Sequence, residues 1–320
     1  MKRKNEPLEK LEGCYTAIIT PMKKGNGINN EIDYDKLFML VDDQIKAGID
    51  GLVVAGTTGQ SATLEHAEQM HFIAEVFNYV NGRTRIIPSA GSNCTREAIN
   101  LSQAIEGEIG PSTLLHVTGY YNNPPPAGQF EHYTTIADRV QGNIILYNVP
   151  GRTSNHIERN TAIELARHPK IIGLKAAPGK HDPELKQLKG IIENTNPDYF
   201  RVLSGEDDLV AKIIGMGGYG VISASANVAP KMFKQMTDYA LSGKYEEAEK
   251  LQERLLPLVR QAVFAAKNPI PLAYMFGSGI RLPLCSLEKA GIPPKQVDTV
   301  LARYNTTELG VNITKYKKFG

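Results

Sequence analysis

Cysteine, excess charge and long apolar runs are all scarce in this chain of 320 residues. Its three cysteines, Cys14, Cys94 and Cys285, lie far apart and lack CxxC spacing, so neither a disulfide framework nor a zinc site is predicted. Lys and Arg total 36 against 34 Asp and Glu, and a formal net charge of +2 gives no electrostatic case for a nucleic-acid partner. No run of about 18 apolar residues occurs, so no membrane span is predicted.

The beginning of the chain and its histidines argue against further classes of protein. Residues 1–10 are charged and lack the apolar segment of a secretory signal, so we expect a cytoplasmic location. The histidines are scattered, and none clusters with carboxylates at the end of a predicted strand. Because no P-loop is present either, we predict neither a metal nor a cofactor.

Short apolar runs alternate with longer amphipathic stretches along the chain. Eight runs are rich in Ile, Val and Leu without polar alternation, which is typical of parallel strands buried on both faces. They are Tyr15–Thr20, Gly51–Ala55, Arg85–Ala90, Thr113–Val117, Ile144–Tyr147, Ile171–Lys175, Arg201–Ser204 and Gly220–Ser223. Helices are predicted between them, and in Glu65–Tyr79 the pattern places Met70, Ile73, Ala74 and Phe77 on one face.

This alternation predicts a (β/α)8 TIM barrel over residues 13–225. A doubly wound open sheet is the alternative, but Thr20-Pro21-Met22-Lys23 is not the glycine-rich dinucleotide loop that usually follows its first strand. Residues 1–12 are assigned to an N-terminal tail. No strand pattern follows Ser223, so residues 226–320 are predicted to form a C-terminal helical extension.

Lys175 is the candidate nucleophile. It closes the apolar run Ile171-Ile172-Gly173-Leu174, and the active site of a (β/α)8 barrel lies at the carboxyl ends of its strands. Burial disfavours the charged ammonium, and a lysine that is partly neutral can form a Schiff base with a carbonyl substrate. A strand-end lysine that extends its ammonium to solvent is the alternative interpretation.

Other strand ends supply groups that complement an amine nucleophile. Tyr147 is a candidate proton carrier, and Thr57 is a candidate link in a hydrogen-bonded chain to it. A packed tyrosine, and a helix cap formed by Thr57 and Thr58, are the alternatives. Backbone amides of the Gly56–Gly59 turn can hold a carboxylate, and Arg152 can grip a second carboxylate with two hydrogen bonds.

An ordered series of motifs resembles the dihydrodipicolinate synthase family. The motifs are GTTGQSATL (Gly56–Leu64), GYYNNPP (Gly119–Pro125), YNVPGRT (Tyr147–Thr153), GLK (Gly173–Lys175), LSGEDD (Leu203–Asp208) and GVISASANVAP (Gly220–Pro230). This resemblance implies a lyase that condenses pyruvate, bound as a Schiff base, with aspartate semialdehyde. The product, 4-hydroxy-tetrahydrodipicolinate, leads to lysine and diaminopimelate. Members are commonly homotetramers.

The resemblance also implies a role for each matching residue. Lys175 forms the imine, and a proton relay consists of Tyr147, Thr57 and Tyr121, the last reaching in from a neighbouring subunit. Substrate contacts are implied for Thr58, Arg152, Gly205 and Ile222, with Arg152 on the carboxylate of aspartate semialdehyde. An allosteric lysine site is implied at Ser61, Ala62, His66, Asn93, Glu97 and Tyr120.

Four positions depart from the family pattern. Gln60 replaces the usual Glu after GTTG, and Ala176 replaces the acidic residue that usually follows the lysine. Both changes remove negative charge near the predicted site. Gly119 stands where a proline is common, and Gln69 stands where some lysine-sensitive members have a histidine.

Two other functions compete with the synthase. One is another pyruvate-dependent aldolase of the same superfamily, of the N-acetylneuraminate or keto-deoxy-sugar type, which shares the imine step but uses a different aldehyde. Arg152 favours the synthase, because sialic acid lyases lack this arginine. The second is a catalytically silent barrel that binds a small acid. The joint presence of Lys175, Tyr147, Thr57, Tyr121 and Arg152 argues against it.

Overall fold

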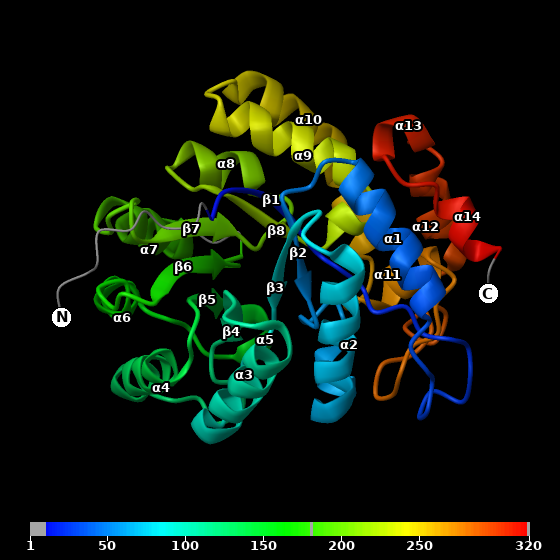
Figure 1. The fold of residues 1–320 in the computed structure, drawn as a ribbon. Coiled ribbons are helices and arrows are strands. Elements are labelled where there is room, and N and C mark those ends of the chain that lie inside the picture. Colours follow the sequence, from blue (N-terminus) through cyan, green and yellow to red (C-terminus); the bar gives the residue numbers. More distant parts are fainter. Residues whose placement is uncertain (1–10, 180–181, 319–320) are drawn as a thin grey trace. The chain divides into compact units, whose positions relative to one another are not determined.

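In the described part of the chain, eight β-strands alternate with helices (Figure 1). The structure, a computed structural model, describes residues 11–179 and 182–318. The strands are β1 (Gly13–Ala17), β2 (Gly51–Val54), β3 (Arg85–Pro88), β4 (Leu114–Val117), β5 (Ile144–Asn148), β6 (Ile171–Ala176), β7 (Arg201–Ser204) and β8 (Gly220–Ser223). Each overlaps one of the eight predicted runs, so the predicted strands are confirmed.

The strands run parallel to their neighbours. β4 pairs with β5, β5 with β6, β6 with β7 and β7 with β8, while β1 pairs with β2. Every residue of β5, β6 and β8 is buried, as expected of strands covered on both faces. A parallel sheet of eight strands with helices between them is the (β/α)8 arrangement, so the predicted fold class is confirmed.

The chain divides into two compact units, of which the first comprises residues 11–13 and 87–222 among those described. Its helices are α3 (Thr95–Ile109), α4 (Pro126–Arg139), α5 (Pro150–Thr153), α6 (Arg159–Leu165), α7 (Asp182–Glu193) and α8 (Val210–Gly215). Within this unit α3 packs against α4, α4 against α6, and α6 against α7. In Figure 1 α3, α4 and α6 lie beside β4, β5 and β6, and α8 lies beside β7.

The second unit comprises residues 14–86 and 223–320, described to residue 318. Its helical elements are α1 (Tyr34–Lys46), η1 (Ser61–Thr63), α2 (His66–Val80), η2 (Ser225–Asn227), α9 (Pro230–Leu241), α10 (Tyr245–Pro257), η3 (Leu258–Val263), α11 (Ile270–Met275), α12 (Pro294–Leu301), α13 (Thr306–Leu309) and α14 (Ile313–Lys317). No strand follows Ser223 among the described residues, in line with the helical character predicted there.

The prediction of which face of α2 is buried is wrong by part of a helical turn. Phe77 is 39% exposed, whereas Phe72, Val76 and Val80 are buried. Residues 70–80 contain two overlapping apolar stripes, and Ile73 belongs to both. Periodicity alone does not decide between such stripes, because the neighbouring elements determine which one is covered.

The end of the predicted N-terminal tail is packed rather than free. Residues 1–10 of that tail lie outside the described part of the chain, but Leu11 is only 1% exposed. A Cβ at Gly173 of β6 would lie 2.6 Å from Leu11 Cδ2, so this glycine leaves room for the leucine. The boundaries at residues 13 and 225 remain predictions, since the compact units divide the chain elsewhere.

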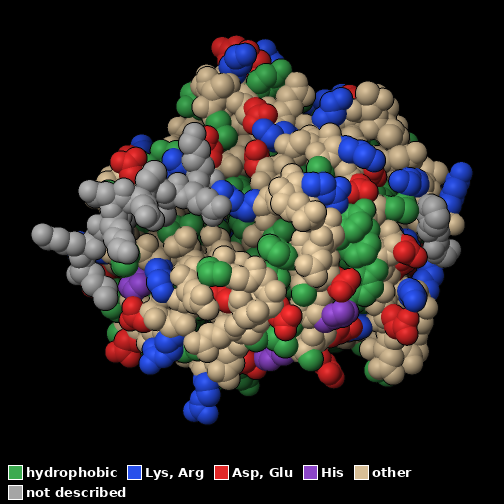
Figure 2. All heavy atoms as spheres, viewed as in Figure 1, with side chains coloured by type: hydrophobic (Ala, Val, Ile, Leu, Met, Phe, Trp, Pro, Cys, Tyr) green, Lys and Arg blue, Asp and Glu red, His purple; other side chains and the backbone are tan. Residues whose placement is uncertain are grey.

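Charges of both signs are mixed on the face of the molecule that Figure 2 shows. Lys and Arg side chains alternate there with Asp and Glu, in keeping with a formal net charge of +2. Within the described residues, every helix is too short or too polar to cross a membrane.

Candidate active site

Lys175 lies on β6 directly across from Tyr147 of β5 in the register of the two strands. The lysine is 6% exposed and the tyrosine 8%. Lys175 Nζ lies over the tyrosine ring, 4.2 Å from its centroid. The side chain therefore does not extend to solvent, and the alternative interpretation of a snorkelling lysine is wrong.

The surroundings of Lys175 favour a neutral amine. Burial is the main reason that the pKa of Lys175 is lowered from 10.5 to about 8, and the positive charge of Arg152 contributes to this shift. Asp207 and Glu206 act in the opposite direction, because negative charge stabilises the ammonium. The desolvation effect dominates, so the neutral fraction of the amine near neutral pH is far larger than that of a solvated lysine, although the ammonium still prevails there.

Glycine at position 205 allows the lysine side chain to pass. A Cβ there would lie 3.2 Å from Lys175 Cε and from the Ala177 Cβ, closer than most Cβ contacts. The Gly205 amide also donates a 2.6 Å hydrogen bond to the carbonyl of Ala176. At Gly205, for which the sequence predicts a substrate contact, the close backbone approach is therefore made to Lys175.

Two acidic residues after β7 place negative charge near Lys175. Asp207 is 2% exposed and Glu206 is half-buried, and both raise the pKa of Lys175. Ser204 Oγ donates to the carbonyl of Glu206 at 2.8 Å and accepts from its amide at 3.1 Å, which fixes the turn. Helix α8 begins only at Val210, so capping that helix does not explain the buried Asp207.

Arg152 stands on the single turn α5. Its neighbour Thr153 is buried and donates from Oγ1 to the carbonyl of Asn155 at 2.8 Å, which closes the turn. Arg152 itself is exposed. Its positive charge lowers the pKa of Lys175, a residue of the same unit, so the two side chains interact electrostatically.

Tyr121 is exposed to solvent, whereas Ile222 of the same unit is buried. Tyr121 is 95% exposed and has a left-handed backbone conformation, with φ +69°. An exposed tyrosine held in that strained conformation has no packing role within the described part of its own chain. Ile222, on β8, is 1% exposed.

Thr57 and Thr58 belong to the second unit and follow β2. Thr58 is 4% exposed, and its Oγ1 accepts a 2.9 Å hydrogen bond from Asn268 Nδ2. Helix α2 has Glu65 as its N-cap, so the alternative of a helix cap at the two threonines is wrong. A Cβ at Gly59 would meet the Ile18 carbonyl at 3.1 Å, which explains the glycine in this tight turn.

Known proteins with related sequences bear directly on this arrangement. The sequence model of the dihydrodipicolinate synthetase family matches residues 10–289. A 4-hydroxy-tetrahydrodipicolinate synthase from Methanocaldococcus jannaschii is 41% identical over 286 residues, covering 87% of this chain and 94% of the relative. This chain belongs to the dihydrodipicolinate synthetase family. The membership predicted from the motif series is confirmed.

Two solved structures of the dihydrodipicolinate synthetase family resemble the fold closely. One is a chloride-inhibited dihydrodipicolinate synthase from Acinetobacter baumannii complexed with pyruvate, at 33% identity and TM-score 0.84, covering 95% of this chain and all of that one. The other is the enzyme from Cyanidioschyzon merolae with lysine bound, at 33% identity and TM-score 0.82, covering 91% of this chain and 97% of that one.

The residues matched to the family's lysine pocket divide between the two units. In the first unit Asn93 Nδ2 donates to the carbonyl of Tyr120 at 3.1 Å, and Glu97 accepts a hydrogen bond from Ser92 Oγ. In the second unit Ser61 and Ala62 form part of η1, and His66 is the first residue of α2.

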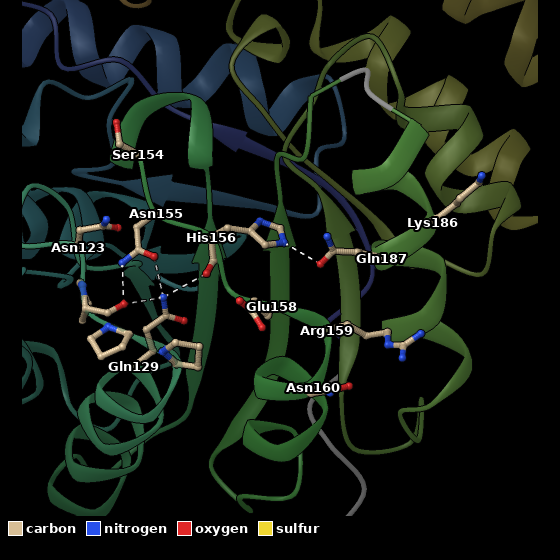
Figure 3. Close-up of a pocket in the computed structure, with 13 residues that line it drawn as sticks. Asn123, Gln129, Ser154, Asn155, His156, Glu158, Arg159, Asn160, Lys186 and Gln187 are labelled. Carbon is tan, nitrogen blue, oxygen red and sulfur yellow. Dashed lines mark hydrogen bonds between the residues drawn. The ribbon is translucent and has the colours of Figure 1, made fainter.

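Sequence reasoning missed a network of amide side chains in the first unit. Gln129 Nε2 donates to Asn155 Oδ1 at 2.8 Å, and Asn155 Nδ2 donates to the carbonyl of Gly119 at 3.1 Å. His156 bonds Asn148 at 3.1 Å and Gln187 at 3.1 Å. Figure 3 shows Gln129 and Asn155 pointing toward one another, and His156 toward Gln187. The sequence signal for this network is the polar run Ser154-Asn155-His156, which directly follows the YNVPGRT motif.

This network forms a wall of a cavity of about 710 Å³ (Figure 3). The cavity is lined by residues 123–126 and Gln129, by residues 154–156 and 158–160, and by Lys186 and Gln187 of α7. Through Asn155 the network ties the loop that carries Tyr121 to the loop that carries Arg152. These hydrogen bonds therefore help to fix the loops of Tyr121 and Arg152, two predicted site residues of the first unit.

Proposed function

We propose that this chain is a 4-hydroxy-tetrahydrodipicolinate synthase that binds pyruvate as a Schiff base on Lys175. The observation that supports it best is a buried lysine with a pKa lowered to about 8, packed over a tyrosine ring at the end of a parallel strand. Such an amine is a competent nucleophile near neutral pH. The relatives named above carry the same activity in their names.

The first half of the proposed reaction forms the imine. Neutral Lys175 Nζ attacks the ketone carbon of pyruvate and gives a carbinolamine, which loses water once its oxygen is protonated. Tyr147 supplies that proton, because its ring already lies against the lysine side chain. Thr57 and Tyr121 extend the relay to solvent, and Thr58 and Ile222 contact the bound pyruvate.

The second half joins the two substrates. Loss of a proton from the pyruvate methyl group gives an enamine, which attacks the aldehyde carbon of aspartate semialdehyde and leaves a hydroxyl group there. The semialdehyde's amine then adds to the imine carbon, closes the ring and expels Lys175 as free amine. Arg152 binds the semialdehyde carboxylate through two parallel hydrogen bonds. One water is released overall.

A homotetramer is proposed for the assembled enzyme. Tyr121 supports it, since a tyrosine that is 95% exposed on its own chain is available to complete a neighbouring subunit's relay. Lysine feedback is proposed at the pocket that contains Asn93 and Glu97, where the carboxylate suits an amino group. Inhibition by lysine that Glu97→Gln abolishes, with the basal rate kept, would support this site, and unaltered inhibition would remove it.

Trapping the imine tests the catalytic proposal. The protein is incubated with pyruvate and borohydride, and the adduct is mapped by mass spectrometry. We expect one reduced adduct on Lys175, none in Lys175→Ala, and an unchanged adduct in the exposed control Lys186→Ala. Absence of the adduct on Lys175 would contradict both this synthase and any other pyruvate lyase.

A second measurement separates the synthase from other pyruvate aldolases. Turnover of aspartate semialdehyde, followed in a coupled assay, should fall roughly 100-fold in Arg152→Ala because the carboxylate clamp orients the aldehyde. The pyruvate adduct should persist in this variant. Loss of both would show that Arg152 serves pyruvate instead, and turnover of a sugar aldehyde but not of the semialdehyde would favour the alternative aldolase.

A further inference from the structure

Arg281 is a buried cation in the second unit, on the segment between α11 and α12. It is 8% exposed, and every guanidinium N–H has an acceptor. The bonds run from Nε to the Asn30 carbonyl at 2.9 Å, from Nη2 to the same carbonyl at 2.6 Å, from Nη1 to the Thr63 carbonyl at 3.1 Å, and from Nη1 and Nη2 to Glu68 Oε2 and Oε1, both at 2.6 Å.

The pairing of Arg281 with Glu68 is a two-pronged ion pair. Each terminal nitrogen of Arg281 donates to one carboxylate oxygen of Glu68, so the pair fixes the relative orientation of the two side chains as well as their separation. Glu68 stands in the first turn of α2, where the helix dipole favours a negative charge. A lysine in place of Arg281 has three donors and no planar fork, and therefore cannot reproduce this set of bonds.

The same arginine holds the loop between β2 and α2. Its guanidinium binds the Thr63 carbonyl, and its own amide donates to Gln60 Oε1 at 3.3 Å. Gln60 is 4% exposed and has a left-handed backbone, φ +58°. The main chain at residue 281 thus contacts this buried glutamine from a segment 221 residues away in sequence, while the guanidinium of the same residue holds Thr63.

Gln60 in turn connects this support to the threonines. The Gln60 amide donates to the Thr57 carbonyl at 3.1 Å, and the Gln60 carbonyl accepts from Thr63 Oγ1 at 2.9 Å. From the other side Asn268 donates to Thr58 Oγ1. Residues 57–63 are therefore held at both ends by the C-terminal part of the chain.

We propose that Arg281 is a positioning residue for pyruvate binding. It fixes residues 57–63 so that Thr57 and Thr58 are presented in one arrangement, while touching neither substrate itself. This rests on the proposed function, in which the two threonines serve the relay and contact pyruvate. The pair is partly buried, and ion pairs removed from solvent contribute little net stability compared with apolar residues, so its role in this proposal is to specify one loop geometry.

Conservative variants test the proposal in the assembled enzyme. Arg281→Lys keeps the positive charge and loses the fork, and Arg254→Lys is the matched control, because Arg254 pairs with Glu308 in the same unit but is 48% exposed. We expect Arg281→Lys to raise the KM for pyruvate and slow borohydride trapping at Lys175 by about 10- to 100-fold, the scale of a small misplacement in a reacting geometry. Arg254→Lys should change neither.

Glu68→Gln keeps the test valid if Arg281→Lys does not fold. It preserves the shape of the partner, removes its charge, and should raise the KM for pyruvate in the same direction. The double variant should be no worse than the more severe single variant, because both remove one interaction.

A merely structural role would lower the unfolding temperature and leave the kinetics of the folded enzyme unchanged, and that result would overturn the proposal. Wild-type protein that forms no pyruvate adduct at Lys175 would instead refute the proposed function, so the two failures are distinguishable.

Discussion

Lys175 Nζ lies 4.2 Å from the centroid of the Tyr147 ring, on the neighbouring strand. The face of an aromatic ring attracts an ammonium ion, which by itself would favour the protonated lysine. Burial of the side chain has the opposite effect and is the larger of the two, since the pKa falls to about 8. The net effect of these surroundings is that Lys175 loses its proton near pH 8 rather than near pH 10.5.

Imine formation should therefore depend on pH with a midpoint near 8. The rate of borohydride-trapped adduct formation rises as the amine loses its proton, whereas a solvated lysine would give a midpoint near 10.5. Arg152→Gln should move the midpoint upward, because the arginine's positive charge lowers the pKa of Lys175. The measurement is trapping rate against pH at saturating pyruvate. A midpoint above 10, or a downward shift in the variant, would contradict this picture.

Lys175 should also cost the protein stability. Below pH 8 the amine is charged in both states, so the folded state bears the full cost of burying it. Between pH 8 and 10.5 the folded state loses its proton first, and that cost disappears as the pH rises. Lys175→Met should be more stable than the wild type at pH 7 by roughly 2–3 kcal/mol.

Urea unfolding at pH 7 and pH 9.5 measures this difference. The stability advantage of Lys175→Met should be smaller at the higher pH, where the wild-type amine is already largely neutral. Lys186→Met, at an exposed position on α7, is the matched control and should show no such dependence on pH. A Lys175→Met protein that is less stable than the wild type at pH 7 would show that burial is compensated by contacts of the ammonium.

The sequence was sufficient for Lys175 and Tyr147 and insufficient for Arg281. The first two stand at the ends of uninterrupted Ile- and Leu-rich runs, and neighbouring parallel strands bring such ends together at one edge. Arg281 depends on Glu68, 213 residues earlier, and on carbonyl groups whose positions no local pattern encodes. The same limit applies to Phe77, whose exposure is decided by what the other stripe of α2 packs against.

The hydrogen bonds of Asn155 should affect the binding of aspartate semialdehyde, the second substrate. Asn155 donates to the carbonyls of Gly119 and Pro124 and accepts from Gln129, so it joins the Tyr121 loop to the Arg152 turn. Asn155→Ala leaves those buried partners unsatisfied, at a cost of about 1–3 kcal/mol in stability. We expect a raised KM for aspartate semialdehyde as well, because Arg152 loses a fixed position.

A kinetic comparison separates the two effects of Asn155→Ala. The rate of pyruvate trapping at pH 8 should stay within about twofold of the wild type, since Lys175 and Tyr147 are held by their strands rather than by this loop. Asn160→Ala, at the far side of the same cavity, is the control. An equal loss in pyruvate trapping would mean that the loop also supports the imine step.

Two buried histidines in the first unit should make the protein sensitive to acid. The pKa of His116 is lowered to about 3, mainly by burial and in part by His132, and burial lowers the pKa of His132 to about 4. Neither His116 Nδ1 nor His132 Nε2 has a hydrogen-bond partner among the described residues. Both rings are therefore neutral in the folded state, while the unfolded chain protonates them below pH 6.5.

Because the unfolded state binds more protons in this range, stability is retained above pH 6.5 and falls as the pH drops toward 4. Each histidine should contribute a loss of about 2 kcal/mol between pH 7.5 and pH 5. The wild type has two such histidines and His132→Asn has one. The loss of stability that they cause on acidification, measured by urea unfolding across that range, should therefore be about half as large in the variant. His71→Asn, which removes an exposed imidazole, is the control. Equal acid sensitivity in the wild type and His132→Asn would mean that the His132 site admits a charged ring.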